Sequence, residues 1–118
     1  MNPKLYKLEQ GMYLKYIEHA KHGATASIEV IERKLSAIIN NCPKHEVYSN
    51  DKKVKHFFKD FYLFTNEDEN IIFWLDWIAD YDYHTKHLSK ELLNNLKRDY
   101  IYFGLSGLGN SFSKNTLK

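Results

Sequence analysis

The sequence FFKDFYLFTNEDENIIFWLDWIADYDY, from Phe57 to Tyr83, is the stretch that decides the fold of this chain. It holds more than half of the aromatic residues, both tryptophans and seven of the fifteen acids, and its only base is Lys59. Large rings dominate the energetics of cores and interfaces, so the fold must bury most of this segment. The rest of the chain therefore has to pack around it.

The second half of this stretch predicts an amphipathic helix from about Asn66 to Tyr81. Its core stripe has helical spacing and consists of Ile71, Trp74, Leu75 and Ile78. A second apolar line beside the acids consists of Phe73, Trp77 and Tyr81. Two interpretations are open. The helix lies between two neighbours in the core, or its second line is a partner-binding face whose acids attract a basic partner.

Four further segments have helical periodicity, namely residues 4 to about 20, 26–41, about 50–64 and 89–103. Thr25 or Ser27 and Ser89 are the expected N-caps, and Gly104 is the expected residue after the last helix. We therefore predict an all-α fold, a compact bundle or irregular array of about five helices. Residues 1–104 form a single helical domain, and the glycine-rich residues 105–118 form a flexible C-terminal tail.

Charge and cysteine usage point to a cytoplasmic protein with an uneven charge distribution. The formal charge is +2, but residues 60–82 carry seven acids and no lysine or arginine. The single Cys42 cannot form an internal disulfide, and beside Pro43 we interpret it as a buried residue rather than a nucleophile. The first twenty residues mix charged and apolar side chains, so we expect no signal peptide and no membrane segment.

No combination of residues in the sequence indicates catalysis or a bound metal. The best metal candidates are Asp76, Asp80, His84 and His87, but their spacing matches no metal motif. Asp76 and Asp80 could pair for acid–base chemistry, yet nothing indicates a cleft around them. We therefore predict that the protein is not an enzyme and that it has no catalytic residues, no metal site and no cofactor.

A lysine-rich segment supports an alternative function. Lys52, Lys53, Lys55 and Lys59 gather on the helix expected over residues 50–64 and could contact nucleic acid. Such a cluster is more often a solvated helix face. Arginine, which base readout and bidentate phosphate contacts prefer, occurs only at Arg33 and Arg98. A helical nucleic-acid-binding or regulatory protein is therefore the alternative prediction.

Our first prediction is a small protein-binding inhibitor that caps a basic, nuclease-like partner through an acidic-aromatic face. The predicted partner-binding residues are Glu69, Phe73, Asp76, Trp77, Asp80, Tyr81 and Asp82. The size, the lack of a catalytic pattern and this face resemble, at the level of class, bacterial immunity proteins and antitoxins. That resemblance implies a protein partner, possibly a toxin. It fixes neither the identity of the partner nor the oligomeric state.

Overall fold

The computed structural model describes residues 2–19, 26–42, 44–48, 52–58, 61–77 and 89–105. These residues form an α+β fold, so the all-α prediction is wrong. The elements are β1 (Lys7–Leu8), α1 (Gln10–His19), α2 (Ile28–Asn41), β2 (Lys44–Tyr48), β3 (Lys53–Phe58), β4 (Phe61–Asn66), β5 (Ile71–Trp77) and α4 (Lys90–Tyr102). The strands form one mixed sheet in the order β1-β5-β4-β3-β2. β1 pairs with β5 in parallel, and the other pairs are antiparallel.

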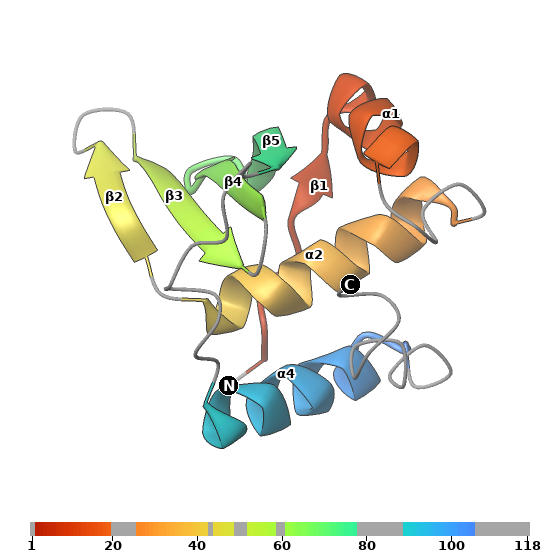
Figure 1. Ribbon diagram of the computed structural model, residues 1–118, viewed down its shortest axis with the longest axis vertical. Coiled ribbons are helices and arrows are strands. Elements are labelled where there is room, and N and C mark those ends of the chain that lie inside the picture. The colour runs from red at the N-terminus through yellow and green to blue at the C-terminus, as the bar shows by residue number, and fades with distance from the viewer. Residues whose placement is uncertain are drawn as a thin grey trace.

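The elements stack in layers, with α2 between the sheet and α4 (Figure 1). Half of the residues of α2 are buried, including Ile31 and Leu35 as well as Ala37 and Ile39. Burial this wide fits a helix with neighbours on two sides. The prediction of a central helix within 66–81 is wrong, and the helix with neighbours on two sides is α2, which we predicted separately over 26–41. α1 lies beside β5 at the edge of the sheet.

The helices predicted over residues 50–64 and 66–81 are wrong, because these segments form β3, β4 and β5. Side chains along the three strands alternate between a buried inner face toward α2 and an outer face. One inner row is His56, Leu63 and Leu75, and the other is Val54, Thr65, Ile72 and Leu8. All seven are buried. This pairing of rows across strands is what a sheet produces and a helix cannot.

A β-bulge explains why β5 has the periodicity of a helix. Phe64 pairs with Trp74, but the next residue, Thr65, pairs with Ile72, so Phe73 is an extra residue in β5. The bulge places the inward-facing Ile72 and Leu75 three residues apart, which is also the spacing of one helix face. The 3.6-residue pattern in this stretch is therefore a property of the bulged strand.

The helices predicted over 26–41 and 89–103 are confirmed as α2 and α4. Ser27 caps α2 by accepting a hydrogen bond from the Val30 amide, and Ser89 caps α4 by accepting one from the Leu92 amide. Gly104 follows α4 with φ 78°, a backbone conformation that glycine adopts without strain. α2 covers the inner face of the sheet, and α4 packs on the other side of α2.

The first predicted helix begins later than expected, because the backbone before Gln10 runs extended along α2. The Lys4 amide donates to Asn40, the Tyr6 amide to Ser36 and the Leu8 amide to Glu32. Two residues of extended chain span about 6.6 Å and four residues of helix about 6.0 Å, so the two spacings match. Side chains four residues apart on α2 thus satisfy every second amide of the N-terminal segment, and we call these three contacts the N-terminal ladder.

Cys42 and Leu105 mark the ends of two helical segments. Cys42 is buried at the end of α2, and burial raises the pKa of its thiol, which makes it a poor nucleophile. Leu105, which we assigned to the tail, is buried in the hydrophobic core. Residues 106–118 lie outside the described part of the chain, so the flexible tail stays a prediction.

Candidate functional site: the outer face of the sheet

The outer face of the sheet carries large rings and lysines in three rows. The rows are Phe57, Tyr62 and Asp76; Lys55, Phe64 and Trp74; and Lys53, Asn66, Ile71 and Lys7. None of these ten side chains is buried, whereas all seven of the inner rows are. Trp74 is 40% exposed, a large fraction for a tryptophan. We call this surface, together with Phe73 at the bulge, the outer face.

Four rings form a continuous file across the outer face. Ring centroids lie 5.9 Å apart for Phe57 and Tyr62, 6.0 Å for Tyr62 and Phe64, and 5.9 Å for Phe64 and Phe73. The planes of neighbouring rings are inclined at 46°, 69° and 55°, as aromatic pairs prefer. The file runs from β3 through β4 to β5, and the cross-strand pair of Phe64 and Trp74 extends it further along β5.

Lysine ammonium groups lie over these rings. The Lys55 Nζ is 4.9 Å from the ring centroid of Phe57, 4.8 Å from that of Tyr62 and 5.6 Å from that of Phe64. The Lys53 Nζ lies 5.4 Å from the ring centroid of Phe73. Each cation is attracted to the negative face of its ring, and this holds both groups at the surface. Cations and apolar rings therefore occupy the same surface.

α1 completes the outer face at its β5 side through Lys15. The Lys15 Nζ lies 4.0 Å from the Trp74 ring centroid and 3.5 Å from an Asp76 carboxylate oxygen. Asp76 is the one carboxylate among the described side chains of the three rows, and this ion pair offsets its charge. The described charged groups of this surface are thus mainly cationic.

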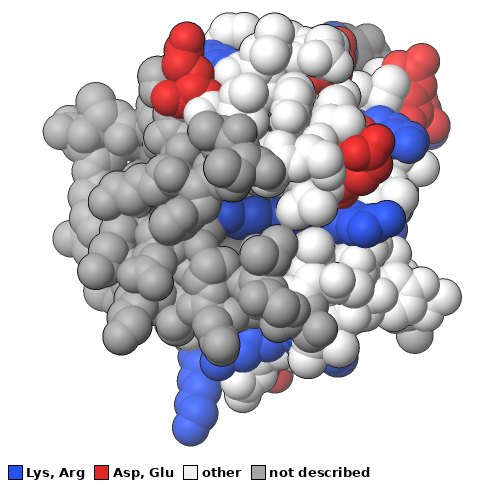
Figure 2. Space-filling view, turned by 90° about the vertical axis from the view of Figure 1, so that its right-hand side faces the viewer, with Lys and Arg blue, Asp and Glu red and all other residues white. Residues whose placement is uncertain are grey.

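One face of the molecule mixes the two signs of charge. Figure 2 shows Lys or Arg side chains and Asp or Glu side chains scattered among uncharged residues on this face, without a large patch of one sign among the described residues in view. Mixed surfaces of this kind are ordinary for a water-exposed protein face. The combination of rings and lysines is therefore what distinguishes the outer face.

The structure separates the residues predicted to form the acidic-aromatic face. Phe73 and Asp76 lie on the outer face, but Glu69 is in the turn before β5, exposed, where its amide donates to Asn66. Asn70 and five strand residues lie between Glu69 and Asp76, and the strand from Ile71 to Asp76 alone spans roughly 16 Å at about 3.3 Å per residue. The Trp77 side chain lies outside what the structure describes. So do Asp80, Tyr81 and Asp82, together with the metal candidates His84 and His87.

The lysines of the alternative prediction are also divided. Lys53 and Lys55 lie on the outer face, two residues apart on β3. Lys52 is in the turn before β3, with φ 55°, and its Nζ pairs with Asp68 at 3.2 Å. Lys59 lies outside the described residues. Two of the four lysines thus join the rings, although no helix carries them.

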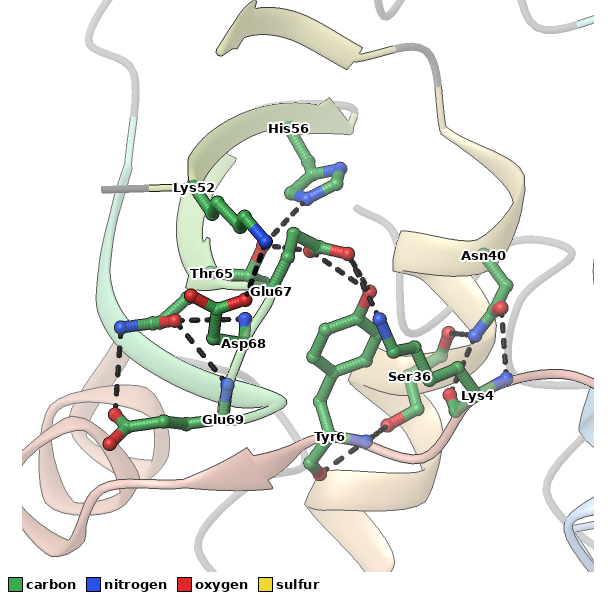
Figure 3. Close-up of polar contacts among 11 residues, drawn as sticks. Lys4, Tyr6, Ser36, Asn40, Lys52, His56, Thr65, Glu67, Asp68 and Glu69 are labelled. Carbon is green, nitrogen blue, oxygen red and sulfur yellow. Dashed lines mark hydrogen bonds and ion pairs between the residues drawn. The ribbon is translucent and has the colours of Figure 1, made fainter. Parts of the chain in front are cut away.

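A second group of polar residues lies on the inner face (Figure 3). The Thr65 hydroxyl donates to Glu67 at 2.6 Å, so its oxygen accepts from the His56 Nε2 at 3.0 Å. Glu67 also accepts from the Tyr6 hydroxyl at 3.0 Å and from the Lys4 Nζ at 3.1 Å. This network ties the N-terminal segment to the turn between β4 and β5.

The network shifts the pKa values of its members. Burial alone would raise the pKa of Glu67, but the hydrogen bonds from Thr65, Lys4 and Tyr6 outweigh burial and lower it. Burial and then the Glu67 carboxylate raise the pKa of Tyr6. A hydroxyl, an imidazole and a carboxylate, the groups of a catalytic triad, are present in Thr65, His56 and Glu67, but they do not have the arrangement of a triad. Thr65 is fully buried and already donates its proton to Glu67, so we interpret the network as structural.

Comparisons with family models, with curated proteins and with solved structures find no match for this chain. Among the described residues, none of the helices combines the length and the apolar character needed to cross a bilayer. In the same part of the chain, no three histidine, cysteine or acidic side chains are grouped as metal ligands would be. The outer face is therefore the feature of the described structure from which we infer a function.

Sequence reasoning missed that Phe57, Tyr62 and Phe64 share a face with Lys53 and Lys55. The two-residue alternation of a strand was present in this segment, since positions 53, 55 and 57 alternate with the apolar or buried positions 54 and 56. Aromatic and β-branched residues are also enriched in strands. The residue that obscured the alternation is His56, a polar side chain on the buried face.

Proposed function

We propose that the protein is a non-enzymatic binding protein whose partner docks on the outer face of the sheet. The observation that carries this proposal is the file of Phe57, Tyr62, Phe64 and Phe73 on three adjacent strands, with the exposed Trp74 beside it. Exposed aromatic clusters mark interaction sites, and tryptophan and tyrosine are enriched among residues that dominate binding energy. The inner face is already occupied by α2, so a partner can reach only the outer one.

The first prediction, an inhibitor of a basic partner such as a nuclease toxin, stays a candidate with one observation in its favour. Phe73 and Asp76, two of its predicted contacts, do share the outer face. Its steering charges have less support, because Asp76 pairs with Lys15 and Glu69 lies at the far end of β5. An acidic surface that attracts a basic protein would need acids around the rings.

Affinity capture with three immobilised proteins tests the proposal. The wild type, Trp74→Ala and Tyr102→Ala are exposed in parallel to an extract of the native host. Tyr102 is a matched control because it is an aromatic residue on α4 with 53% exposure, and α2 separates α4 from the sheet. We expect a bound species that Trp74→Ala loses and Tyr102→Ala keeps, with all three proteins folded by circular dichroism. An identical capture pattern for all three, including an empty one, contradicts the proposal.

A further inference from the structure

We propose that Lys34 is a modification site whose amine takes an acyl group from an activated donor, either a thioester or an acyl phosphate. The site lies on α2 and uses none of the side chains of the outer face. This inference therefore goes beyond the proposed function and can fail without affecting it. It starts from the surroundings of the Lys34 amine, which differ from those of most lysines, since a charged group that is taken out of water is ordinarily paired.

The Lys34 side chain extends from α2 to α1 through apolar surroundings. Lys34 is partly buried, and its Nζ lies 5.8 Å from the ring centroid of Tyr16, a buried residue of α1. On α2, the positions one turn away include the apolar residues Val30, Ile31 and Ile38, and both isoleucines are buried. Because Lys34 is not fully buried, a small donor can reach it from solvent.

Among the described residues, Lys34 has neither an ion pair nor a hydrogen bond. The buried carboxylates of α2 and α4 bond elsewhere, since Glu32 accepts from a backbone amide of β1 and Asp99 accepts from the Asn41 side chain. The tyrosine ring of α1 attracts the cation but carries no net charge that could offset it. Burial accordingly lowers the pKa of Lys34 to about 8.

A lysine in such surroundings is more reactive than an exposed one, because only the neutral amine has a lone pair that can attack a carbonyl group. At pH 7, a pKa of about 8 leaves roughly a tenth of the amine neutral, against roughly one part in 2,500 at the ordinary value of about 10.4. A less basic group is also a weaker nucleophile, and the coefficient of about 0.4–0.5 known for thiolates would take back about tenfold. The remaining advantage is about twentyfold, before any obstruction by the neighbouring side chains.

The reaction replaces a charged group by a neutral one. The lone pair of the Lys34 nitrogen attacks the acyl carbon and forms a C–N bond, the thiolate or phosphate leaves with the electrons of its bond to that carbon, and the nitrogen gives a proton to water. The product is an uncharged amide, so the cost of keeping an ammonium in apolar surroundings disappears. Carbon dioxide would instead give a carbamate, whose negative charge has the same cost.

Rates of acetylation measured lysine by lysine test this inference. Acetyl phosphate and acetyl coenzyme A, one donor of each kind, are incubated separately with the folded wild type at pH 7, and mass spectrometry of digests gives the initial rate at each lysine. We expect the rate at Lys34 to exceed that at Lys97, an exposed lysine of α4, by at least about fivefold with one donor or both. The donor that gives the larger excess identifies the source of the acyl group.

The dependence of these rates on pH and on folding locates the cause. The rate at Lys34 should level off above about pH 8, whereas the rate at an ordinary lysine rises until about pH 10. In the chain unfolded by urea, where burial is lost, the rates at Lys34 and Lys97 should agree within about twofold.

Lys34→Arg is the matched variant, because it keeps a positive charge and removes the amine. After the same treatment, acetylation should raise the melting temperature of the wild type at pH 7 and leave that of folded Lys34→Arg without this gain. Equal rates at Lys34 and Lys97 in the folded protein, or the same excess at Lys34 in the unfolded chain, would overturn the inference. So would a wild type that gains no more from acetylation than Lys34→Arg. Lys34 would then be a lysine whose stem only covers apolar surface.

Discussion

Replacing Thr65 by valine removes one hydroxyl from the buried network and keeps nearly the same shape. In the wild type that hydroxyl donates to Glu67 at 2.6 Å and accepts from the His56 Nε2 at 3.0 Å. Thr65 is fully buried on the inner face, so water cannot replace either bond. The substitution therefore tests whether the network holds the N-terminal segment to the sheet.

The expected loss of stability is the sum of two costs and one gain. A hydrogen bond to a charged group contributes about 1.5–3 kcal/mol, and removing the acceptor of a buried donor costs about 1–3 kcal/mol. The added methyl group returns roughly 1 kcal/mol through burial of apolar surface. Such contributions are not strictly additive, so we expect Thr65→Val to lower the free energy of unfolding by about 2–4 kcal/mol.

Urea denaturation followed by circular dichroism measures this loss. With an m value of about 1–3 kcal/mol/M, a loss of about 3 kcal/mol lowers the midpoint by roughly 1–3 M. Thr65→Ser is the matched control, because it keeps the hydroxyl and loses only a methyl group, at about 1 kcal/mol. A valine variant as stable as the serine variant, or more stable, would refute the role assigned to the hydroxyl.

Four further variants test other parts of the structure. The pKa of Glu67 is lower in the folded protein than in the unfolded chain. The stability that its ionised carboxylate contributes is therefore complete above the ordinary pKa and is lost as pH falls through the pKa of the folded protein. Glu67→Gln should therefore be less stable at neutral pH but lose less stability than the wild type in acid urea titrations below about pH 4. Burial lowers the pKa of Lys34 to about 8, so its protonated form costs stability at pH 7, and a cost remains until pH reaches its unfolded pKa. Lys34→Met should raise the melting temperature at pH 7, and its advantage over the wild type should shrink between pH 8 and about pH 10; a constant advantage would show that ionisation is not the cause. Leu75→Ala should lower the free energy of unfolding, measured in urea, by about 2–5 kcal/mol, because Leu75 is fully buried. A loss under about 1 kcal/mol would contradict the place of Leu75 in a buried inner row. Ser36→Ala should speed hydrogen exchange at the Tyr6 amide, which donates to the serine hydroxyl at 2.7 Å, and unchanged exchange there would count against the N-terminal ladder.

Local signals in the sequence were enough to predict α2 and α4. Each has a serine N-cap, an acid in its first turn and apolar residues at helical spacing that become buried, such as Ile31 and Leu96. For both helices, the N-cap, the first-turn acid and the apolar spacing all indicate a helix at the same residues. A segment is predictable from its sequence when such independent signals agree.

The turn after β4, and β5 itself, were mistaken for one helix because two helical signals there are real but local. Asn66 does accept from the Glu69 amide, as the N-cap residue of a capping box does, and its side-chain amide donates to the Glu69 carboxylate at 3.5 Å. The chain then turns instead of coiling, with Asn70 at φ 55°. The same asparagine contacts open a helix or close a hairpin, so they could not decide between the two. The bulge at Phe73 supplied the second signal.

The N-terminal ladder could not be predicted, because it depends on tertiary contacts. Glu32, Ser36 and Asn40 recur every four residues on α2, which in sequence resembles an ordinary polar helix face. Only the fold shows that Glu32 and Ser36 are buried and bond to backbone amides 24 and 30 residues away in the chain. The outer face could not be predicted for the same reason, since only the pairing of β3, β4 and β5 brings its rows together.

The most direct test of the outer face as the binding surface is a nuclear magnetic resonance titration of ring signals with the partner that the wild type captures from extract. We predict that the rings of Tyr62, Phe64 and Trp74 shift and saturate together, because a partner docked on them alters the magnetic field at their protons. The ring of Tyr102, exposed on α4, should stay unchanged. Signals of α4 that shift while those three rings stay fixed, or no shift in any ring, would contradict the account.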